Sequence, residues 1–381
     1  MTVKDLLLVM IKAKASDLYL TVDSPPIFRV EGVTRAYGDV KMTPHQCEEI
    51  AMSLMSERQK AKFSETMEMN LGLFYPEIGR FRVNIYLQKG FVAIVFRQIK
   101  LEIETIDDLK LPPVLKDIAA TKRGLVLVVG GTGTGKSTTL AAMIEERNRT
   151  TNGHIVTIED PIEFIYPHRK CIVSQREVGI DTLSYTDALK NAMRQAPDVI
   201  LIGEIRDRET MESAVTFSET GHLCLATLHA NNANQAIERI MNFFPPEKHD
   251  QIYFQLSLNM RAVISQRLIP GVDGKRLAAV EILLDSPRVK DLIMKHRGEV
   301  LKEAMAESTK EGMQTFDQHI FQYFIEGKIS YENAIVYADS ANDLRLRIKI
   351  DEVSAASSRA RETQSDLSET FRIRIDENRT K

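Results

Sequence analysis

The sequence predicts an α/β protein, with a small α+β domain followed by a larger domain that has a mostly parallel sheet and a helical C-terminal part. Three observations predict it. An apolar run at 125–129 leads into a glycine-rich loop and then a helical stretch. Strand-like and helical segments alternate from about residue 120, as in parallel sheets. The first 98 residues contain strands joined by a hairpin instead.

The N-terminal region, residues 1–98, is predicted to hold helices near 3–14 and 43–65 and strands at 27–30 and within 80–97. Gln88-Lys-Gly90 marks a hairpin turn. In the strand from residue 80 the side chains alternate: Phe81, Val83 and Ile85 share one face, and Arg80, Arg82 and Asn84 share the other. Residues 99–113 are predicted to be a linker, because this segment ends in paired prolines.

The second domain is predicted to span residues 114–350, and 351–381 to form a disordered tail in which 371–375 alternates like a short strand. Two helix starts carry cap signals, at Ser184-Tyr-Thr-Asp187 and at Thr315-Phe-Asp-Gln318. The predicted strands are 125–129, 155–158, 199–202, 223–227 and 278–283.

The glycine-rich loop has the pattern G-x-x-x-x-G-K-S of a phosphate-binding loop. Glycines let consecutive backbone N–H groups turn toward phosphate oxygens, and the start of the next helix favours negative charge. Lys136 would contact the β- and γ-phosphates, and Ser137 would supply a hydroxyl for Mg²⁺. The predicted cofactors are therefore ATP and Mg²⁺. The predicted nucleotide-binding residues are Gly130, Gly131, Thr132, Gly133, Thr134, Gly135, Lys136, Ser137 and Thr138.

Hydrolysis also needs an acidic residue for the metal and a group that orients or deprotonates water. Two acidic segments follow predicted strands. The first, 157–163, contains Glu159, Asp160 and Glu163. The second, 198–204, is an apolar strand that ends in Gly203-Glu204, a Walker B arrangement in which Glu204 would hold Mg²⁺ through water.

Several histidines and arginines are further candidates. His222 and His229 flank a predicted strand, and they could sense phosphate or a neighbouring subunit; their separation of seven residues argues against a helical zinc pair. Arg80, Arg82 and Arg97 in the first domain, and Arg194 before the Walker B strand, form either a solvated basic face or arginine fingers that act across a domain or subunit boundary.

Bulk properties limit the class of protein. The net charge of −3 and the lack of an Arg/Lys–aromatic groove pattern disfavour nucleic acid as a partner. No apolar run reaches the length of a membrane span, and the apolar start lacks a basic region and a cleavage site. The three cysteines are too far apart for a zinc ribbon. We therefore expect a cytoplasmic location.

These motifs, in this order, resemble the secretion-type ATPase family, and specifically its type IV pilus retraction branch (the PilT/PilU branch). The loop at 130–138, the acidic box at 157–163, Walker B at 198–204 and a histidine box at 220–231 carry the resemblance. So do the segments Ala15-Ser-Asp-Leu-Tyr19-Leu, Pro25-Pro26-Ile-Phe-Arg-Val-Glu-Gly32 and Gly312-Met-Gln-Thr-Phe-Asp-Gln318.

The resemblance implies a PAS-like N-terminal domain joined to a RecA-like ATPase domain, and a homo-hexameric ring with nucleotide between the two domains. It implies that a glutamate of the acidic box is the general base, either Glu163 or, as second choice, Glu159. It also implies that Arg80, Arg82 and Arg97 contact nucleotide. The implied partners are a PilT-like retraction ATPase and an inner-membrane pilus platform protein.

Departures from the principal retraction motors point to an accessory retraction ATPase. The chain has Tyr19 where those motors have His, only part of their C-terminal signature at 287–294, and the additional tail. The expected function is ATP-driven pilus retraction at the cytoplasmic face of the inner membrane. The alternative is a ring that mainly docks on the principal motor and has little motor activity of its own.

Overall fold

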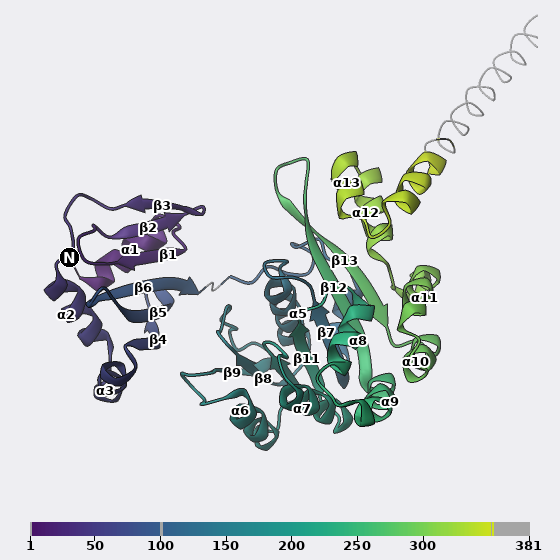
Figure 1. Ribbon diagram of the computed structural model, residues 1–381, viewed down its shortest axis with the longest axis horizontal. Coiled ribbons are helices and arrows are strands. Elements are labelled where there is room, and N and C mark those ends of the chain that lie inside the picture. The colour runs from purple at the N-terminus through teal and green to yellow at the C-terminus, as the bar shows by residue number, and fades with distance from the viewer. Residues whose placement is uncertain (1, 100–101, 352, 354–381) are drawn as a thin grey trace, which may run out of the picture. The chain divides into compact units, whose positions relative to one another are not determined.

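The computed structural model describes residues 2–99, 102–351 and 353. These residues form one six-stranded and one seven-stranded sheet with helices between and after them (Figure 1). The predicted α/β class is confirmed. Of the tail predicted at 351–381, residues 351 and 353 are helical, and 352 and 354–381 lie outside the described residues. Among the described residues, no helix combines the length and the apolar character that crossing a membrane requires.

The six-stranded sheet has the order β3-β2-β1-β6-β5-β4, and every neighbouring pair in it is antiparallel. The predicted alternation on β5 is confirmed, because Phe81, Val83 and Ile85 are fully buried. The strands are β1 (Asp17–Leu20), β2 (Ile27–Val30), β3 (Val33–Ala36), β4 (Glu68–Tyr75), β5 (Gly79–Gln88) and β6 (Phe91–Ile99). Its helices are α1 (Val3–Lys12), α2 (Pro44–Leu54) and α3 (Glu57–Thr66).

The seven-stranded sheet has the order β13-β12-β7-β11-β10-β8-β9. Strands β9, β8, β10 and β11 are parallel to their neighbours in that series. Since Ile158 pairs with Ile202, the residues that follow β8 and β10 emerge at the same edge of the sheet. The strands are β7 (Gly124–Val129), β8 (Gly153–Glu159), β9 (Cys171–Glu177), β10 (Val199–Ile202), β11 (Leu223–Leu228), β12 (Met260–Pro270) and β13 (Arg276–Leu284).

Two helices of the second domain begin where the cap signals predict. Ser184 caps α6 by accepting from the Asp187 N–H, and Thr315 with Gln318 forms a capping box on α12. The helices are α4 (Val114–Ala120), α5 (Lys136–Thr150), α6 (Tyr185–Ala192), α7 (Arg208–Glu219), α8 (Ala233–Met241), α9 (His249–Asn259), α10 (Pro287–Met294), α11 (Leu301–Glu307), α12 (Phe316–Ile325) and α13 (Tyr331–Tyr337).

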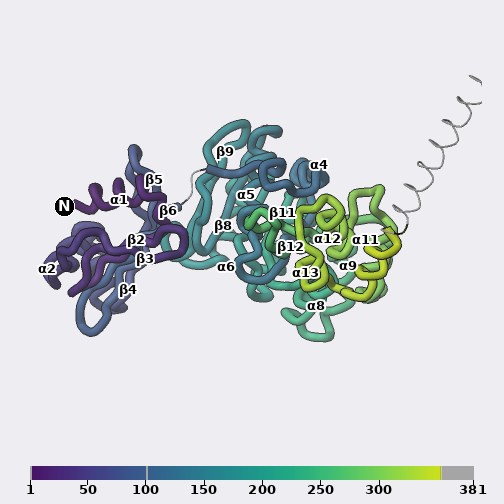
Figure 2. The backbone as a smooth tube through the Cα atoms, turned by 90° about the horizontal axis from the view of Figure 1, so that it is seen from above, coloured from purple at the N-terminus to yellow at the C-terminus, as the bar shows by residue number. Residues whose placement is uncertain are grey.

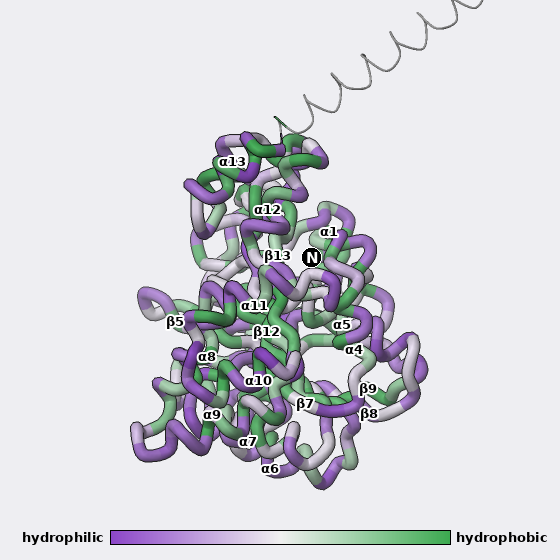
Figure 3. Tube along the Cα trace, turned by 90° about the vertical axis from the view of Figure 1, so that its right-hand side faces the viewer, coloured by the Kyte–Doolittle hydropathy of each residue, from purple (hydrophilic) through white to green (hydrophobic). Residues whose placement is uncertain are grey.

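A separate hydrophobic core joins the C-terminal helices to strands β12 and β13. Phe316 and Ile320 of α12 pack with Ile269 and Ala279 of these strands. Figure 2 shows α11, α12 and α13 beside one another near the end of the described chain. Figure 3 shows that hydrophobic residues predominate along β12, as expected for an interior strand.

Candidate functional site

The glycine-rich loop adopts a backbone that only glycine accommodates at several positions. Gly130, Gly133 and Gly135 have φ angles of 156°, 76° and 89°. A Cβ atom on Gly130 would lie 2.6 Å from the carbonyl oxygen of Gln266, and one on Gly135 would lie 2.8 Å from its side-chain nitrogen. The loop leads directly into α5, whose first residue is Lys136. This strand–loop–helix arrangement can place backbone N–H groups around phosphate oxygens.

Lys136 lies in a partly buried environment that two carboxylates influence. Burial lowers the pKa of Lys136, and the negative charges of Glu204 and Glu163 oppose that shift. The charges of Glu204 and Glu163 thus act on Lys136, so one residue from each of the three predicted motifs contributes to the same electrostatic environment. A lysine at the start of a helix favours a phosphate, and carboxylates nearby favour a hydrated cation.

Glu204 directly follows the Walker B strand β10, as predicted, and it pairs with an arginine that the sequence analysis missed. Nε of Arg206 donates to Glu204 Oε2 at 2.6 Å, and Nη1 of Arg206 lies 3.7 Å from Asp160 Oδ2. The signal was available, because Arg206 stands two residues after Glu204. The arginine neutralises part of the acidic charge that parallel pairing of β8 and β10 concentrates at this edge.

The donor types present fit Mg²⁺. Ser137 offers a hydroxyl in the first turn of α5, and Glu204 is a carboxylate with 18% of its side chain exposed. Mg²⁺ in nucleotide sites keeps several waters and binds phosphates plus one or two protein oxygens. In the part of the chain that the structure describes, no cluster of three or more His, Cys, Asp and Glu side chains could hold a metal ion.

Gly203 is close to protein groups rather than to open space. A Cβ atom there would lie 3.1 Å from the hydroxyl of Tyr185 and 3.2 Å from Cα of Glu159. A larger residue would not fit at this position, because the backbone of the acidic box and Tyr185 fill that space.

The two candidate bases have different environments. Glu159 is buried, with 7% exposure, and accepts hydrogen bonds from Thr157 Oγ1 at 2.7 Å and Gln175 Nε2 at 3.3 Å. Burial raises its pKa to about 7, and a hydrogen bond from the backbone N–H of Glu163 partly opposes the shift. Glu163 is exposed. Glu159 thus holds the turn that presents Glu163, and only Glu163 is open to a water molecule from solvent.

The raised pKa of Glu159 predicts a pH-dependent stability that Glu159→Gln removes. The folded state keeps this proton up to about pH 7, whereas the unfolded state loses it near 4.5. Stability from Glu159 is therefore fully present below pH 4.5 and is lost as pH rises through 7. The difference between the folded and unfolded pKa of Glu159 corresponds to about 3 kcal/mol in the free energy of unfolding.

Urea unfolding at pH 5 and pH 8 should show Glu159→Gln gaining stability over the natural protein mainly at pH 8. The same substitution at exposed Glu48 should give no such difference. If Glu159→Gln changed the free energy of unfolding equally at both pH values, the raised pKa of Glu159 would be contradicted.

The histidines and Arg194 are not all brought to the same edge of the sheet. His222 precedes β11; its carbonyl accepts from the N–H of Gly124, and its Nδ1 lies 3.1 Å from Thr220 Oγ1. Arg194 lies in the short 3₁₀ helix η1 (Met193–Gln195), which precedes β10. His229 follows β11 and is exposed. His222 and His229 therefore lie at opposite ends of one strand, about 20 Å apart by strand geometry, and do not form one site.

The three arginines of the first domain lie together. Arg82 pairs with Arg97 across β5 and β6, and Arg80 projects from the same face two residues earlier. Nε of Arg97 donates to Asp17 Oδ1 at 2.8 Å, and this carboxylate is buried. That bond raises the pKa of Arg97. The structure thus presents a preassembled cationic face on the N-terminal sheet.

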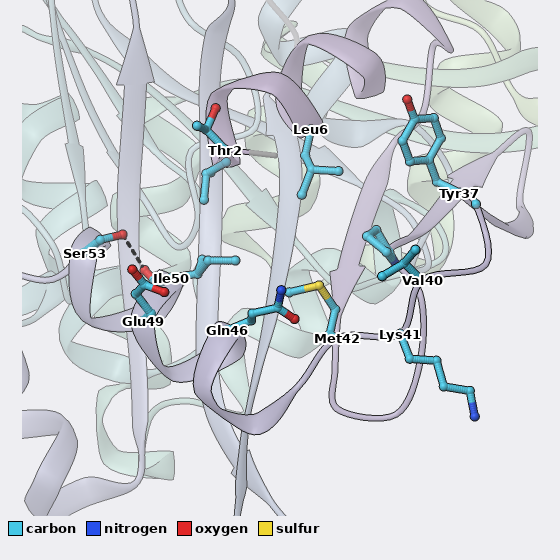
Figure 4. Close-up of a pocket in the computed structure, with 13 residues that line it drawn as sticks. Thr2, Leu6, Tyr37, Val40, Lys41, Met42, Gln46, Glu49, Ile50 and Ser53 are labelled. Atoms are coloured by element: carbon cyan, nitrogen blue, oxygen red, sulfur yellow. Dashed lines mark hydrogen bonds between the residues drawn. The ribbon is translucent and has the colours of Figure 1, made fainter.

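A cavity of about 700 Å³ lies elsewhere in the N-terminal domain, between α1, the loop before α2, and α2 itself. Leu6, Tyr37, Val40 and Ile50 contribute apolar surface, and Lys41 lies at its rim (Figure 4). None of the predicted nucleotide-binding or catalytic residues lines it.

Comparison with known proteins gives a consistent result. Residues 93–315 match the family model described as type II/IV secretion system protein. The chain is 52% identical to the type IV pilus ATPase PilU of Pseudomonas aeruginosa, over 93% of this chain and 94% of that protein. It is 40% identical to the retraction ATPase PilT of the same organism, over 88% and 97%. A crystal structure of the pilus retraction motor PilT with bound ADP superposes with a TM-score of 0.84 at 38% identity, over 91% of this chain and 99% of that one.

Proposed function

This chain belongs to the type II/IV secretion system family, as a PilT/PilU-type pilus ATPase, and on that basis we propose that it is a magnesium-dependent, hexameric motor that assists the principal retraction ATPase. The observation that carries the proposal is the glycine loop leading into Lys136 at the start of α5, together with two acidic segments that follow β8 and β10 at one edge of the sheet. The accessory role rests on the departures from the principal retraction motors at Tyr19 and at 287–294.

In the proposed site, the backbone N–H groups of residues 130–138 bind the phosphates of ATP, and Lys136 contacts the β- and γ-phosphates. Mg²⁺, held by Ser137 and through water by Glu204, would neutralise charge on the phosphates. Glu163 orients the attacking water and accepts its proton, with Glu159 holding the turn beneath it. Arg206 keeps the Glu204 carboxylate in place.

We assign the supply of positive charge to Arg80, Arg82 and Arg97, which would approach nucleotide from the N-terminal domain, and to Arg194, which would act between subunits. His229 would sense phosphate or a neighbouring subunit. Such a charge from a neighbouring domain or subunit raises phosphoryl-transfer rates roughly 10³–10⁵-fold. It would also make hydrolysis depend on ring assembly. We retain the domain boundaries 1–98, 99–113 and 114–350 for this arrangement, with 351–381 as a tail.

We place the ring at the cytoplasmic face of the inner membrane, in contact with a PilT-like ATPase and the pilus platform protein. The test is steady-state ATP turnover of this protein, measured with and without that ATPase. The mass of the assembly is measured in parallel by light scattering. We expect a hexamer whose turnover is weak alone and rises at least about threefold with the partner.

Strong turnover by the isolated hexamer, unchanged by the partner, would contradict the accessory role and leave a self-sufficient motor. Absence of turnover under both conditions, with stable association, would favour a docking ring instead. A variant lacking residues 351–381 should then show whether the tail carries that association in a pull-down.

A further inference from the structure

Strand β12 carries two adjacent polar residues, Gln266 and Arg267, that contact different parts of the chain. Successive side chains on a strand point to opposite faces, so neighbours can contact separate elements. Gln266 is buried, with 3% exposure, in a strand that is otherwise largely apolar. Burying a side-chain amide or a guanidinium costs free energy unless the group has hydrogen-bond or ion-pair partners.

Gln266 supports the glycine-rich loop from behind. Its side-chain amide donates to the backbone carbonyl of Thr134 at 2.8 Å. The backbone carbonyl oxygen of Gln266 lies 2.6 Å from where a Cβ atom on Gly130 would be. The side-chain nitrogen of Gln266 lies 2.8 Å from the corresponding position at Gly135. The side chain thus holds the Thr134 carbonyl in a fixed orientation within the loop.

Arg267 is bonded to the C-terminal helices. Its guanidinium donates to the carbonyl of Tyr337 at 3.0 Å, pairs with Asp339 and lies 3.9 Å above the ring of Phe316. Asp339 is held in turn, because its N–H donates to Asp317 at 2.7 Å and Lys302 reaches both carboxylates at 3.2 Å. Arg267 therefore ties β12 to α12, to the end of α13 and to the segment after it, and Lys302 connects α11 to the same carboxylates.

We propose that the pair Gln266–Arg267 couples the conformation of the nucleotide loop to the C-terminal helices, with Gln266 as a positioning residue for the phosphates. A shift of the loop that moves Thr134 pulls on Gln266, and the peptide that joins Gln266 to Arg267 transmits the movement to the Asp317–Asp339 cluster. The inference rests on the proposed function, because it requires that the loop binds nucleotide.

The first test compares Gln266→Met, which keeps the side-chain volume but lacks the donor, with a matched control. Gln314 also donates its side-chain amide to a backbone carbonyl at 2.8 Å, that of Val280, and so Gln314→Met is the control. We expect Gln266→Met to weaken fluorescent ADP binding and raise KM for ATP about 10-fold, since Thr134 loses its partner. Gln314→Met should leave both within twofold.

The second test reads the coupling by hydrogen–deuterium exchange of backbone amides in residues 316–350. Saturating ADP should change this exchange in the natural protein but not in Gln266→Met or Arg267→Lys. Arg267→Lys keeps the charge but loses the planar fork, so it should retain ADP affinity within about twofold. It serves as the independent variant if Gln266→Met melts at a much lower temperature.

The outcomes separate the two proposals. If the natural protein fails to bind ADP, the proposed function is wrong. If it binds ADP but exchange in 316–350 does not respond, or responds equally in the variants, the coupling is wrong and the nucleotide site stands.

Discussion

Lys136→Ala is expected to lower ATP turnover by at least about 100-fold, the usual effect of removing one group that stabilises charge in a transition state. Lys136 is the first residue of α5, next to the loop whose backbone would surround the phosphates. Its half-buried position lowers its pKa, and the negative charges of Glu204 and Glu163 oppose that shift. Alanine removes the cation and leaves those two carboxylates facing the phosphates.

The measurement is steady-state phosphate release with fluorescent nucleotide binding on the same samples. Lys122→Ala is the control, since this lysine is exposed and lies just before β7. Its turnover should match that of the natural protein. Turnover of Lys136→Ala within a few-fold of the control would mean that the loop does not bind the hydrolysed nucleotide, and the proposed function would fail.

Local signals allowed much of the fold to be predicted. The strand before the glycine loop is fully buried, and both predicted caps are present, at Ser184 and Thr315. These features depend on neighbouring residues alone. Strands β1, β3, β4, β9 and β12 were not predicted. Strand β3 is exposed at every residue, whereas β4 alternates between more and less buried positions and could have been recognised. The region 43–65 was predicted to be a single helix, but it forms two helices, because Met55 takes an extended conformation.

Alternation of apolar residues also proved ambiguous. The segment Leu344-Arg-Leu-Arg-Ile-Lys-Ile350 alternates as a strand would, yet these residues are helical. Leu344 and Ile348, four residues apart, are the ones buried, whereas Leu346 and Ile350 are exposed. A helix buries positions i and i+4, so the two periods share some positions and only the tertiary contacts decide between them.

The parts of the site that could not be predicted depend on contacts between distant residues. Gln266 is 132 residues from Thr134, and nothing in the local sequence of β12 indicates that its amide supports the loop. The pairing of Arg206 with both Glu204 and Asp160 likewise follows from the parallel register of β8 and β10. The order of the motifs predicted which residues carry the chemistry. It did not predict which other residues keep those side chains in position.

Glu163→Gln is expected to lower kcat by roughly 10²–10⁴-fold while ADP affinity changes little, as for loss of a general base. The amide has the same shape as the carboxylate but cannot accept the proton of the attacking water. Its backbone N–H still bonds to Glu159, so the turn is expected to keep its conformation. The measurement is kcat and KM for ATP, with Glu48→Gln as a control at an exposed helix position.

The pH dependence of kcat distinguishes Glu163 from Glu159 as the base. A base must be deprotonated to act, so a rate that depends on Glu159 should rise through about pH 7, where burial places its pKa. If Glu163 is the base, Glu159→Gln should retain at least about a tenth of the turnover and Glu163→Gln should lose nearly all of it. The reverse order, with a rise through pH 7 that disappears in Glu159→Gln, would transfer the role to Glu159. Its buried carboxylate would then have to reach water by displacing Thr157 or Gln175, which the present hydrogen bonds oppose.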